Sequence, residues 1–209
     1  MRQQTLEEHA WERLVAMMAQ EGWSLARGSG RHFDAPGAGS LVLQVYPQMD
    51  PVDDGVVMIP ALSVANSEVA SLLGAFKGLP GYSAALYGRG LTDVLRDRGL
   101  QVSPYERWFI ADDGAIESVL ATFRLDVSEY GTAFFRRFGG LEDVIDQLKA
   151  KPRDKTANEI VIVASAVAGR RDEALSVLAQ YEDAAASQSP LIAARSRAFA
   201  RAFRDYFSW

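Results

Sequence analysis

The side chains that could support chemistry in this chain of 209 residues are few, because it contains two histidines and no cysteine. His9 lies among Glu7, Glu8 and Glu12, which are side chains that can bind a metal. However, no second histidine follows four residues later, which is the spacing that puts two ligands on one helix face. We therefore interpret His9 as part of a solvated helix surface and predict no tightly bound transition metal.

The second histidine, His32, follows a glycine-rich segment, Gly28–Ser29–Gly30, that we interpret as a hairpin loop. The segment is not a phosphate-binding loop, because it lacks the Gly-Lys-Ser/Thr ending that holds phosphates and magnesium. The chain also has no Gly-x-Ser-x-Gly nucleophile elbow. With no base or nucleophile identifiable beside it, His32 is interpreted as a residue at a strand end. We assign no catalytic residue and no cofactor.

Two groups of carboxylates have local explanations. Asp50, Asp53 and Asp54 precede Gly55, but they do not follow the alternate spacing of a calcium loop. Because Asp and Pro favour turns, we predict an acidic turn over residues 51–55. Asp112 and Asp113 stand before a helical pattern, where a carboxylate caps the helix and complements its dipole.

The strongest candidates for a binding surface are the aromatic residues of the central stretch, residues 106–149: Trp108, Tyr130, Phe134 and Phe135. They could line a groove. At helical spacing beside a strand, aromatic side chains more often belong to the core, which is the interpretation that we favour. The sequence leaves both alternatives open.

Basic residues form a second candidate surface near the end of the chain. Arg197 and Arg201 share one face of a predicted helix with Arg204, and four more basic residues stand at 149–155. These could bind an anion or nucleic acid, or they could be the solvated back of an amphipathic helix. The formal net charge of −5 opposes the electrostatic attraction on which nucleic-acid binding depends, so nucleic acid is disfavoured as a partner.

The first half of the chain predicts a helix followed by a mostly antiparallel sheet. The helix is expected to begin at Thr5, in a capping box with Glu8, and to end at Gly22. Asn66 is expected to cap a second, short helix, and another is expected over residues 91–98. The predicted strands are residues 23–26, 32–34, 41–46 (ended by Pro47), 56–64 (an edge or a bulge at Pro60), 82–87 and 107–110.

The second half is predicted to be helical. Apolar residues from Ile116 to Val127 recur three and four apart, Gly131 is expected to break this helix, and a short helix is expected over 141–148. Three more helices are predicted at 157–168, 171–185 and 190–207. We predict an α+β fold with two domains: a sheet with helices packed on it at residues 1–148, and a helical bundle at 156–209. The linker is expected at 149–155.

The charge and the composition suggest a location. Residues 1–148 hold twelve Lys/Arg and twenty Asp/Glu, whereas residues 149–209 hold ten and seven. Any acidic surface should therefore lie in the first part. The N-terminus lacks an apolar signal core, and no apolar window is long enough to span a membrane. Together with the absence of cysteine, these features favour a cytoplasmic protein that does not act at a membrane.

Two stretches resemble known families. The run Ala168–Leu175, with Gly169 and Asp172–Glu173, resembles the turn between paired helices in tetratricopeptide-type repeats, which implies a helical hairpin over 157–186. The stretch from Val56 to Leu148 resembles a group of uncharacterised bacterial proteins, through Trp108–Phe109, Tyr130–Phe135 and Leu141–Ile145. Some members are suspected immunity or interaction proteins, so the resemblance implies a binding role.

Two functions of different classes remain. The leading hypothesis is a cytoplasmic, non-enzymatic protein-binding module, associated with immunity or defence as the resemblance implies. The alternative is a small-molecule-binding protein or an enzyme that uses carboxylates and arginines in a pocket facing the sheet. A deep polar pocket with Arg107 or Asp112 would favour the alternative, and a flat acidic or aromatic surface would favour the first. The sequence does not identify the partner or the oligomeric state.

Overall fold

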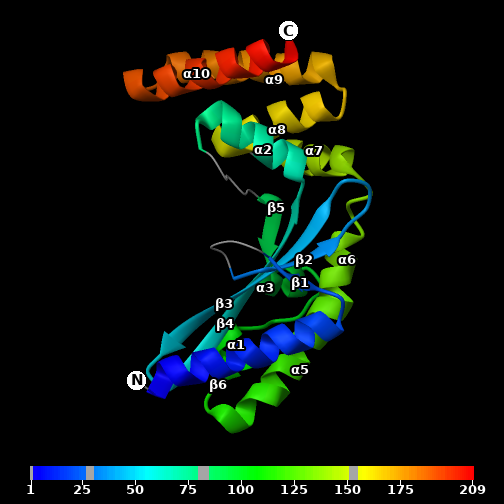
Figure 1. Cartoon of the computed structure of the whole chain (residues 1–209), viewed down its shortest axis with the longest axis vertical. Coiled ribbons are helices and arrows are strands. Elements are labelled where there is room, and N and C mark those ends of the chain that lie inside the picture. The colour runs from blue at the N-terminus through cyan, green and yellow to red at the C-terminus, as the bar shows by residue number, and fades with distance from the viewer. Residues whose placement is uncertain (1, 27–30, 80–84, 151–154) are drawn as a thin grey trace. The chain divides into compact units, whose positions relative to one another are not determined.

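The computed structural model describes residues 2–26, 31–79, 85–150 and 155–209, without the side chains of 2–4 and 155 (Figure 1). The chain forms two compact units. The first, which we call the sheet unit, comprises Met1–Gly37, Val42–Val64 and Gly88–Arg137. The second, the helical unit, comprises Ala38–Leu41, Ala65–Tyr87 and Phe138–Trp209.

The described part of the chain contains one six-stranded sheet, which confirms the α+β fold class. Its order is β1-β2-β3-β4-β5, with β6 also paired to β4. The registers of β1 with β2, β2 with β3 and β4 with β6 are antiparallel. The strands are β1 (Ser24–Leu25), β2 (Phe33–Pro36), β3 (Val42–Val52), β4 (Gly55–Ala65), β5 (Ala85–Gly90) and β6 (Phe109–Ile110).

None of the three prolines in the long hairpin of β3 and β4, Pro47, Pro51 and Pro60, ends its strand. We expected β3 to stop before Pro47, but it continues to Val52. The pairing of β2 with β3 ends at Val45, so Pro47 lies where a missing N–H costs no bond to that neighbour. Pro60 stands on β4 between Val57, which pairs with β6, and Ser63, which faces Gly88 of β5. Pro60 therefore lies between the part of β4 that pairs with β6 and the part that faces β5.

Helices cover one face of this sheet. The helix α1 (Arg2–Gln20) places Trp11 against Phe33 of β2, with ring centroids 5.5 Å apart. A second helical segment runs through α5 (Ile116–Asp126), the π-helical η2 (Val127–Gly131) and α6 (Thr132–Phe135). Gly131 of η2 lies over Leu62 of β4. The break predicted at Gly131 is wrong, because Gly131 ends the π-helical turn and the chain continues directly into α6.

Other boundaries also differ from the predicted ones. Thr5 lies inside α1, which begins at Arg2, so it does not cap the helix. Arg107 ends the short helix α4 (Pro104–Arg107), so only Phe109 and Ile110 of the predicted last strand form β6. The helix α3 (Leu91–Arg96) confirms the expected helix. The predicted loop at 28–30, the start of the strand at 82–87 and residues 151–154 of the linker lie outside the described residues.

The helical unit contains the three predicted C-terminal helices and recruits two earlier ones. The helix α2 (Ser67–Lys77) is capped by Asn66, whose side chain accepts a hydrogen bond from Val69 N at 2.9 Å, as expected. It packs on the C-terminal helices α8 and α10, and α7 also packs on α8. The units therefore do not follow the division expected at 149–155. The remaining helices are α7 (Leu141–Lys149), α8 (Lys155–Val167), α9 (Arg171–Ala186) and α10 (Pro190–Phe207).

A buried carboxylate links the helices of this unit. Glu159 of α8 forms an ion pair with Lys77 of α2 at 2.7 Å and accepts a hydrogen bond from the Tyr181 hydroxyl of α9 at 2.6 Å. Burial, followed by this hydrogen bond, raises the pKa of Tyr181 well above its ordinary value, so the hydroxyl stays protonated as a donor. No helix in the described ranges is long and apolar enough to cross a membrane.

Replacing Phe134 by alanine should lower the free energy of unfolding by about 3–5 kcal/mol, because its ring is buried in the sheet unit. The ring lies 5.3 Å from that of Phe135, which in turn lies 5.9 Å from Trp23. Denaturant unfolding would measure the loss. The control is Tyr105→Ala at an exposed ring, which should stay within about 0.5 kcal/mol of wild type. Equal stability of the two variants would contradict this placement.

Candidate functional site

The aromatic residues proposed from sequence as a groove lie mostly in the core. Trp108, Phe134 and Phe135 are buried, and Tyr130 is half-buried. This is the core alternative that the helical spacing favoured. A partner could reach the three buried rings only if the sheet unit opened.

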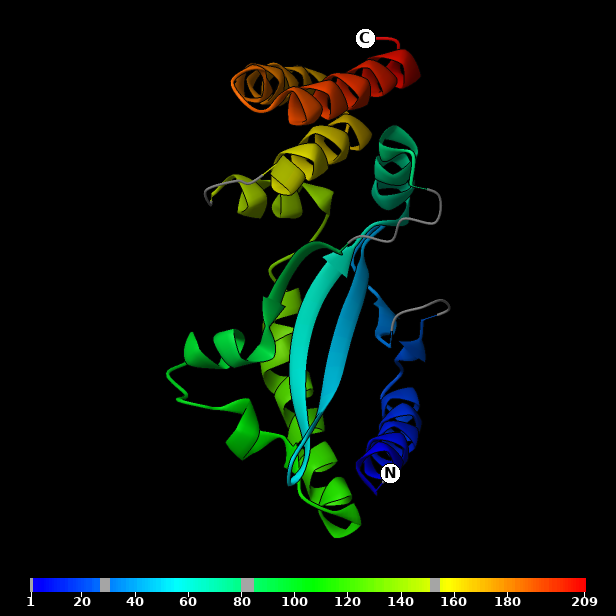
Figure 2. The same cartoon turned by 90° about the vertical axis from the view of Figure 1, so that its left-hand side faces the viewer.

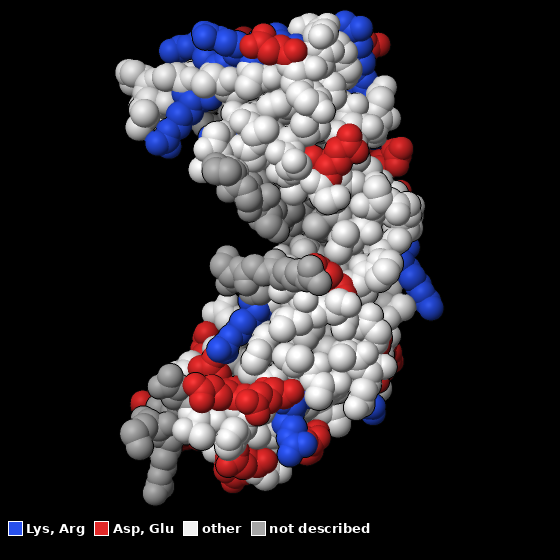
Figure 3. Space-filling model, viewed as in Figure 1, with Lys and Arg blue, Asp and Glu red and all other residues white. Residues whose placement is uncertain are grey.

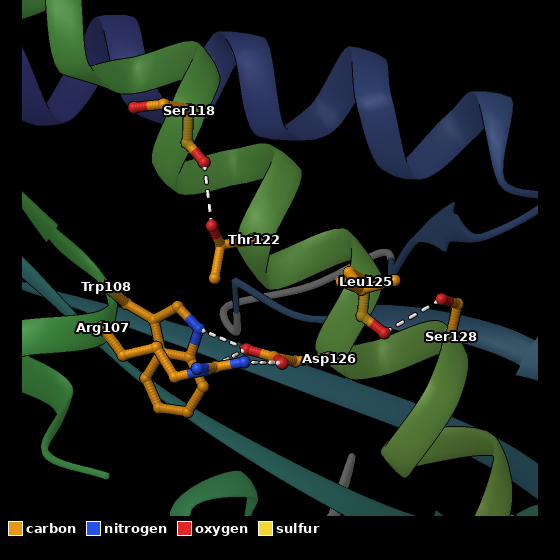
Figure 4. A network of polar contacts seen from close by, with 7 residues as sticks. All are labelled: Arg107, Trp108, Ser118, Thr122, Leu125, Asp126 and Ser128. Atoms are coloured by element: carbon orange, nitrogen blue, oxygen red, sulfur yellow. Dashed lines mark hydrogen bonds and ion pairs between the residues drawn. The ribbon is translucent and has the colours of Figure 1, made fainter.

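Trp108 instead takes part in a buried polar network (Figure 4). Its indole Nε1 donates to Asp126 Oδ2 at 2.9 Å, and Arg107 donates to both oxygens of the same carboxylate, at 2.7 and 2.5 Å. The hydrogen bond with Asp126 raises the pKa of the Arg107 guanidinium, and partial burial opposes that rise. Arg107 and Trp108 stand at the end of α4, and Asp126 belongs to α5. These hydrogen bonds therefore fasten α4 to α5.

His9 has a partner far away in the sequence, which its local surroundings do not predict. Its Nδ1 lies 3.1 Å from Asp113 Oδ1, which connects α1 to the short 3₁₀ helix η1 (Asp113–Ala115). Asp112 caps that helix, as expected, by accepting a bond from Ala115 N at 3.1 Å. The contacting side chains border a shallow surface hollow of about 370 Å³ between α1 and α5. The His9 side chain is half-exposed there, and its contact with Asp113 links α1 to η1.

We expect elemental analysis of protein purified without chelator to find no stoichiometric zinc or iron. Within the described ranges, no group of three or more His, Asp or Glu side chains is arranged to hold an ion. The His9 and Asp113 pair offers only two ligands, whereas structural transition-metal sites use about four. One equivalent of metal that survives dialysis would contradict the expectation, and a His9→Ala variant would show whether this pair holds it.

A denser set of polar side chains lies on the sheet face opposite α1 and η2. Successive side chains of a strand point to opposite faces. On β3, Val45, Pro47 and Met49 are therefore on the buried, helix-covered face. Of the alternating positions that point the other way, the four central ones are polar, Gln44, Tyr46, Gln48 and Asp50, and the two at the strand ends are valines. We call this the polar sheet face, and it also includes His32, Asp34 of β2 and Ser63 of β4.

The polar sheet face is organised around the buried amide of Gln44. Its Oε1 accepts hydrogen bonds from the Tyr46 hydroxyl at 3.0 Å and from Ser63 Oγ at 3.1 Å. Its Nε2 donates to Asp34 Oδ1 at 3.0 Å, across the Asp34–Gln44 register of β2 and β3. One amide thus connects three strands and fixes the rotamers of its neighbours, because a satisfied buried polar network is rigid.

His32 forms an aromatic pair with Tyr46, whose hydroxyl is bonded to this amide. Their ring centroids are 4.5 Å apart with 18° between the ring planes, and His32 Nε2 lies 3.5 Å from Asp34 Oδ1. His32 Nδ1 is buried and has no hydrogen-bond partner among the described residues. Burial, and after it the charge of Asp34, raises the pKa of Tyr46, so its hydroxyl stays a neutral donor.

This arrangement favours recognition over catalysis. The hydroxyls of Ser63 and Tyr46 both donate hydrogen bonds to the Gln44 amide, which is not a base. Neither hydroxyl is therefore activated as a nucleophile. What remains is a preorganised surface of aromatic rings, amides and carboxylates. From sequence, His32 is predicted only as a strand end, and the cluster is not predicted. The alternating polar residues from Gln44 to Asp50 were the available signal, but the expected end at Pro47 concealed it.

The two arginines selected from sequence, Arg197 and Arg201, are exposed on α10, where Lys and Arg side chains gather in Figure 3. Arg204 differs from the expectation of full solvation, because it donates to both oxygens of Glu182 on α9, at 3.0 and 2.6 Å. That arginine therefore fastens α10 to α9. For Arg197 and Arg201, the structure shows the solvated face of an amphipathic helix.

The fold and the polar sheet face define an α+β protein whose sheet carries helices on one side and a hydrogen-bonded polar surface on the other. Comparisons with protein-family models, with curated proteins and with solved structures found no match.

Proposed function

We propose that this chain is a cytoplasmic, non-enzymatic protein-binding module that recognises its partner through the polar sheet face. The observation that carries the proposal is the Gln44 network, which holds Tyr46 and Asp34 in fixed positions on the outer side of the sheet. Rigid aromatic and polar side chains bind partners at a low entropic cost, because they are already ordered in the free protein.

The accessibility of this face supports the proposal. In Figure 2, β3 and β4 stand in front of α5, and no helix described in the sheet unit lies in front of them. Gln48 is exposed and Tyr46 and Asp50 are half-buried, whereas Gln44 and Ser63 are buried. Hydrogen-bonded side chains spread along neighbouring strands suit another macromolecule better than a small ligand, which normally requires a concave pocket that buries most of it.

The residues on which an enzymatic function would depend are engaged elsewhere. Arg107 is bonded to Asp126, and Asp112 caps η1. Neither lies on the polar sheet face. The absence of cysteine supports the cytoplasmic part of the proposal, because proteins of a reducing compartment are rarely stabilised by disulfides. The immunity or defence role belongs to the resemblance alone.

Photo-crosslinking in cells of the source organism tests the proposal. A benzophenone amino acid at Gln48, an exposed position of the polar sheet face, should give a discrete crosslinked protein. The same group at Leu125, which is exposed on α5, serves as the matched control and should not give that product. Finding no product at Gln48, or the same products at both positions, would contradict the proposal.

A further inference from the structure

We infer that the partner of the polar sheet face is a basic protein segment that presents arginine side chains to β2 and β3. The inference rests on the proposed function and adds the chemistry of the partner. Three features carry it: the distribution of charge between the units, the aromatic pair beside a carboxylate, and the spacing of carboxylates along β3.

The net negative charge of the chain belongs to one unit. The sheet unit has 11 Lys/Arg and 16 Asp/Glu, which gives −5, whereas the helical unit has 11 of each and is neutral. The stretch that forms β2, β3 and β4, residues 33–65, contains four Asp and no Lys or Arg. A positively charged partner would therefore meet attraction without competing repulsion over these strands.

The aromatic pair supplies a platform for a planar cation. Tyr46 stacks on His32, and Asp34 lies beside His32 with its side chain 34% exposed. The Gln44 amide binds only Oδ1 of Asp34, so this carboxylate keeps lone pairs on its solvent-accessible side. A guanidinium stacks on aromatic rings and pairs with carboxylates through its planar fork, which an ammonium cannot do. The combination therefore favours arginine over lysine.

The carboxylates are spaced to bind more than one cation. Asp34 pairs in register with Gln44, and Asp50 stands six residues farther along β3, which is about 20 Å at the rise of a strand. Gln48 donates to both oxygens of Asp50, at 2.9 and 3.1 Å, and so orients it. Asp53 and Asp54 follow at the hairpin turn. An extended segment that lies along β3 could thus place basic residues against Asp34, Asp50 and the turn.

The test uses three peptides of equal length, oligo-arginine, oligo-lysine and oligo-glutamate, with the full chain. Oligo-arginine should bind most tightly, and oligo-glutamate should not bind. Raising the salt from about 0.1 M to about 1 M shortens the Debye length from about 10 Å to about 3 Å, so binding should weaken strongly. NMR shifts on titration should concentrate in Phe33–Pro36 and Val42–Val52. Shifts concentrated on α1, or no binding, would overturn the inference.

Substitutions separate the site from general charge attraction. Asp34→Asn combined with Asp50→Asn keeps the acceptor oxygens and should weaken oligo-arginine binding about tenfold, through the loss of two exposed ion pairs. Glu8→Gln with Glu12→Gln removes the same charge from exposed positions of α1 and should have little effect. Equal losses in the two double variants would overturn the inference.

The aromatic contribution has its own pair of variants. Tyr46→Leu removes the ring and should weaken oligo-arginine binding about threefold, and oligo-lysine binding less. Tyr46→Phe keeps the ring and should bind like wild type. If Gln48 crosslinks a cellular partner but oligo-arginine does not bind, the binding module stands and its basic partner is wrong. If neither occurs, both are wrong.

Discussion

Deletion of residues 190–209 should yield a chain that is insoluble or melts far below the wild type. The helix α10 buries Phe199 and Phe203 against α9 and α2, and the ring of Phe76 on α2 lies 5.9 and 6.0 Å from theirs. Burying two Phe side chains contributes up to roughly 3–6 kcal/mol. That is a large share of the ~5–15 kcal/mol by which a typical domain is stable.

Point variants separate loss of this core from loss of the helix as such. Phe203 is fully buried, so Phe203→Ala should lower the free energy of unfolding by about 3–5 kcal/mol. Tyr206 also lies near Phe76, but it is 61% exposed, so Tyr206→Ala should cost much less. Thermal melts of both variants decide the matter. If the truncated chain melts like wild type, α10 is an appendage rather than part of the core.

The elements that the sequence predicted well are those specified by local chemistry. The apolar stripe of Phe199, Phe203 and Tyr206 has spacings of four and three residues, so α10 could be assigned from sequence. Asn66 predicts the start of α2, because an asparagine side chain accepts a hydrogen bond from a free N–H in the first turn of a helix. Such signals span only a few residues and do not depend on the rest of the fold.

The parts that could not be predicted depend on contacts between distant residues. Nothing local to α2 shows that Phe76 packs against α10, more than a hundred residues later. For the same reason, the polar sheet face was missed. The partners of its central amide, Gln44, cannot be predicted locally, because only the strand order brings Asp34 and Ser63 beside it. Pro47 misled the interpretation, because whether proline ends a strand depends on which neighbour pairs there.

Asp126 shows the same limit and leads to the second large prediction. Its carboxylate is fully buried, and its described donors are Arg107 and Trp108. Arg107→Met should lower the free energy of unfolding by about 3–5 kcal/mol, because it leaves a buried charge with the Trp108 indole as its one remaining described donor. Urea unfolding with a constant m-value would measure this loss as a change in stability alone.

The reverse substitution should cost less, which makes the prediction specific. The Arg107 side chain is 28% exposed, so after Asp126→Leu its guanidinium can turn towards water. The double variant, Arg107→Met with Asp126→Leu, removes both charges and should be more stable than Arg107→Met alone, because replacing a whole buried pair is often nearly neutral. Trp108 still loses its acceptor, at a cost of about 1–3 kcal/mol. If the two single losses simply add in the double variant, the pair is not coupled and the buried-charge explanation is wrong.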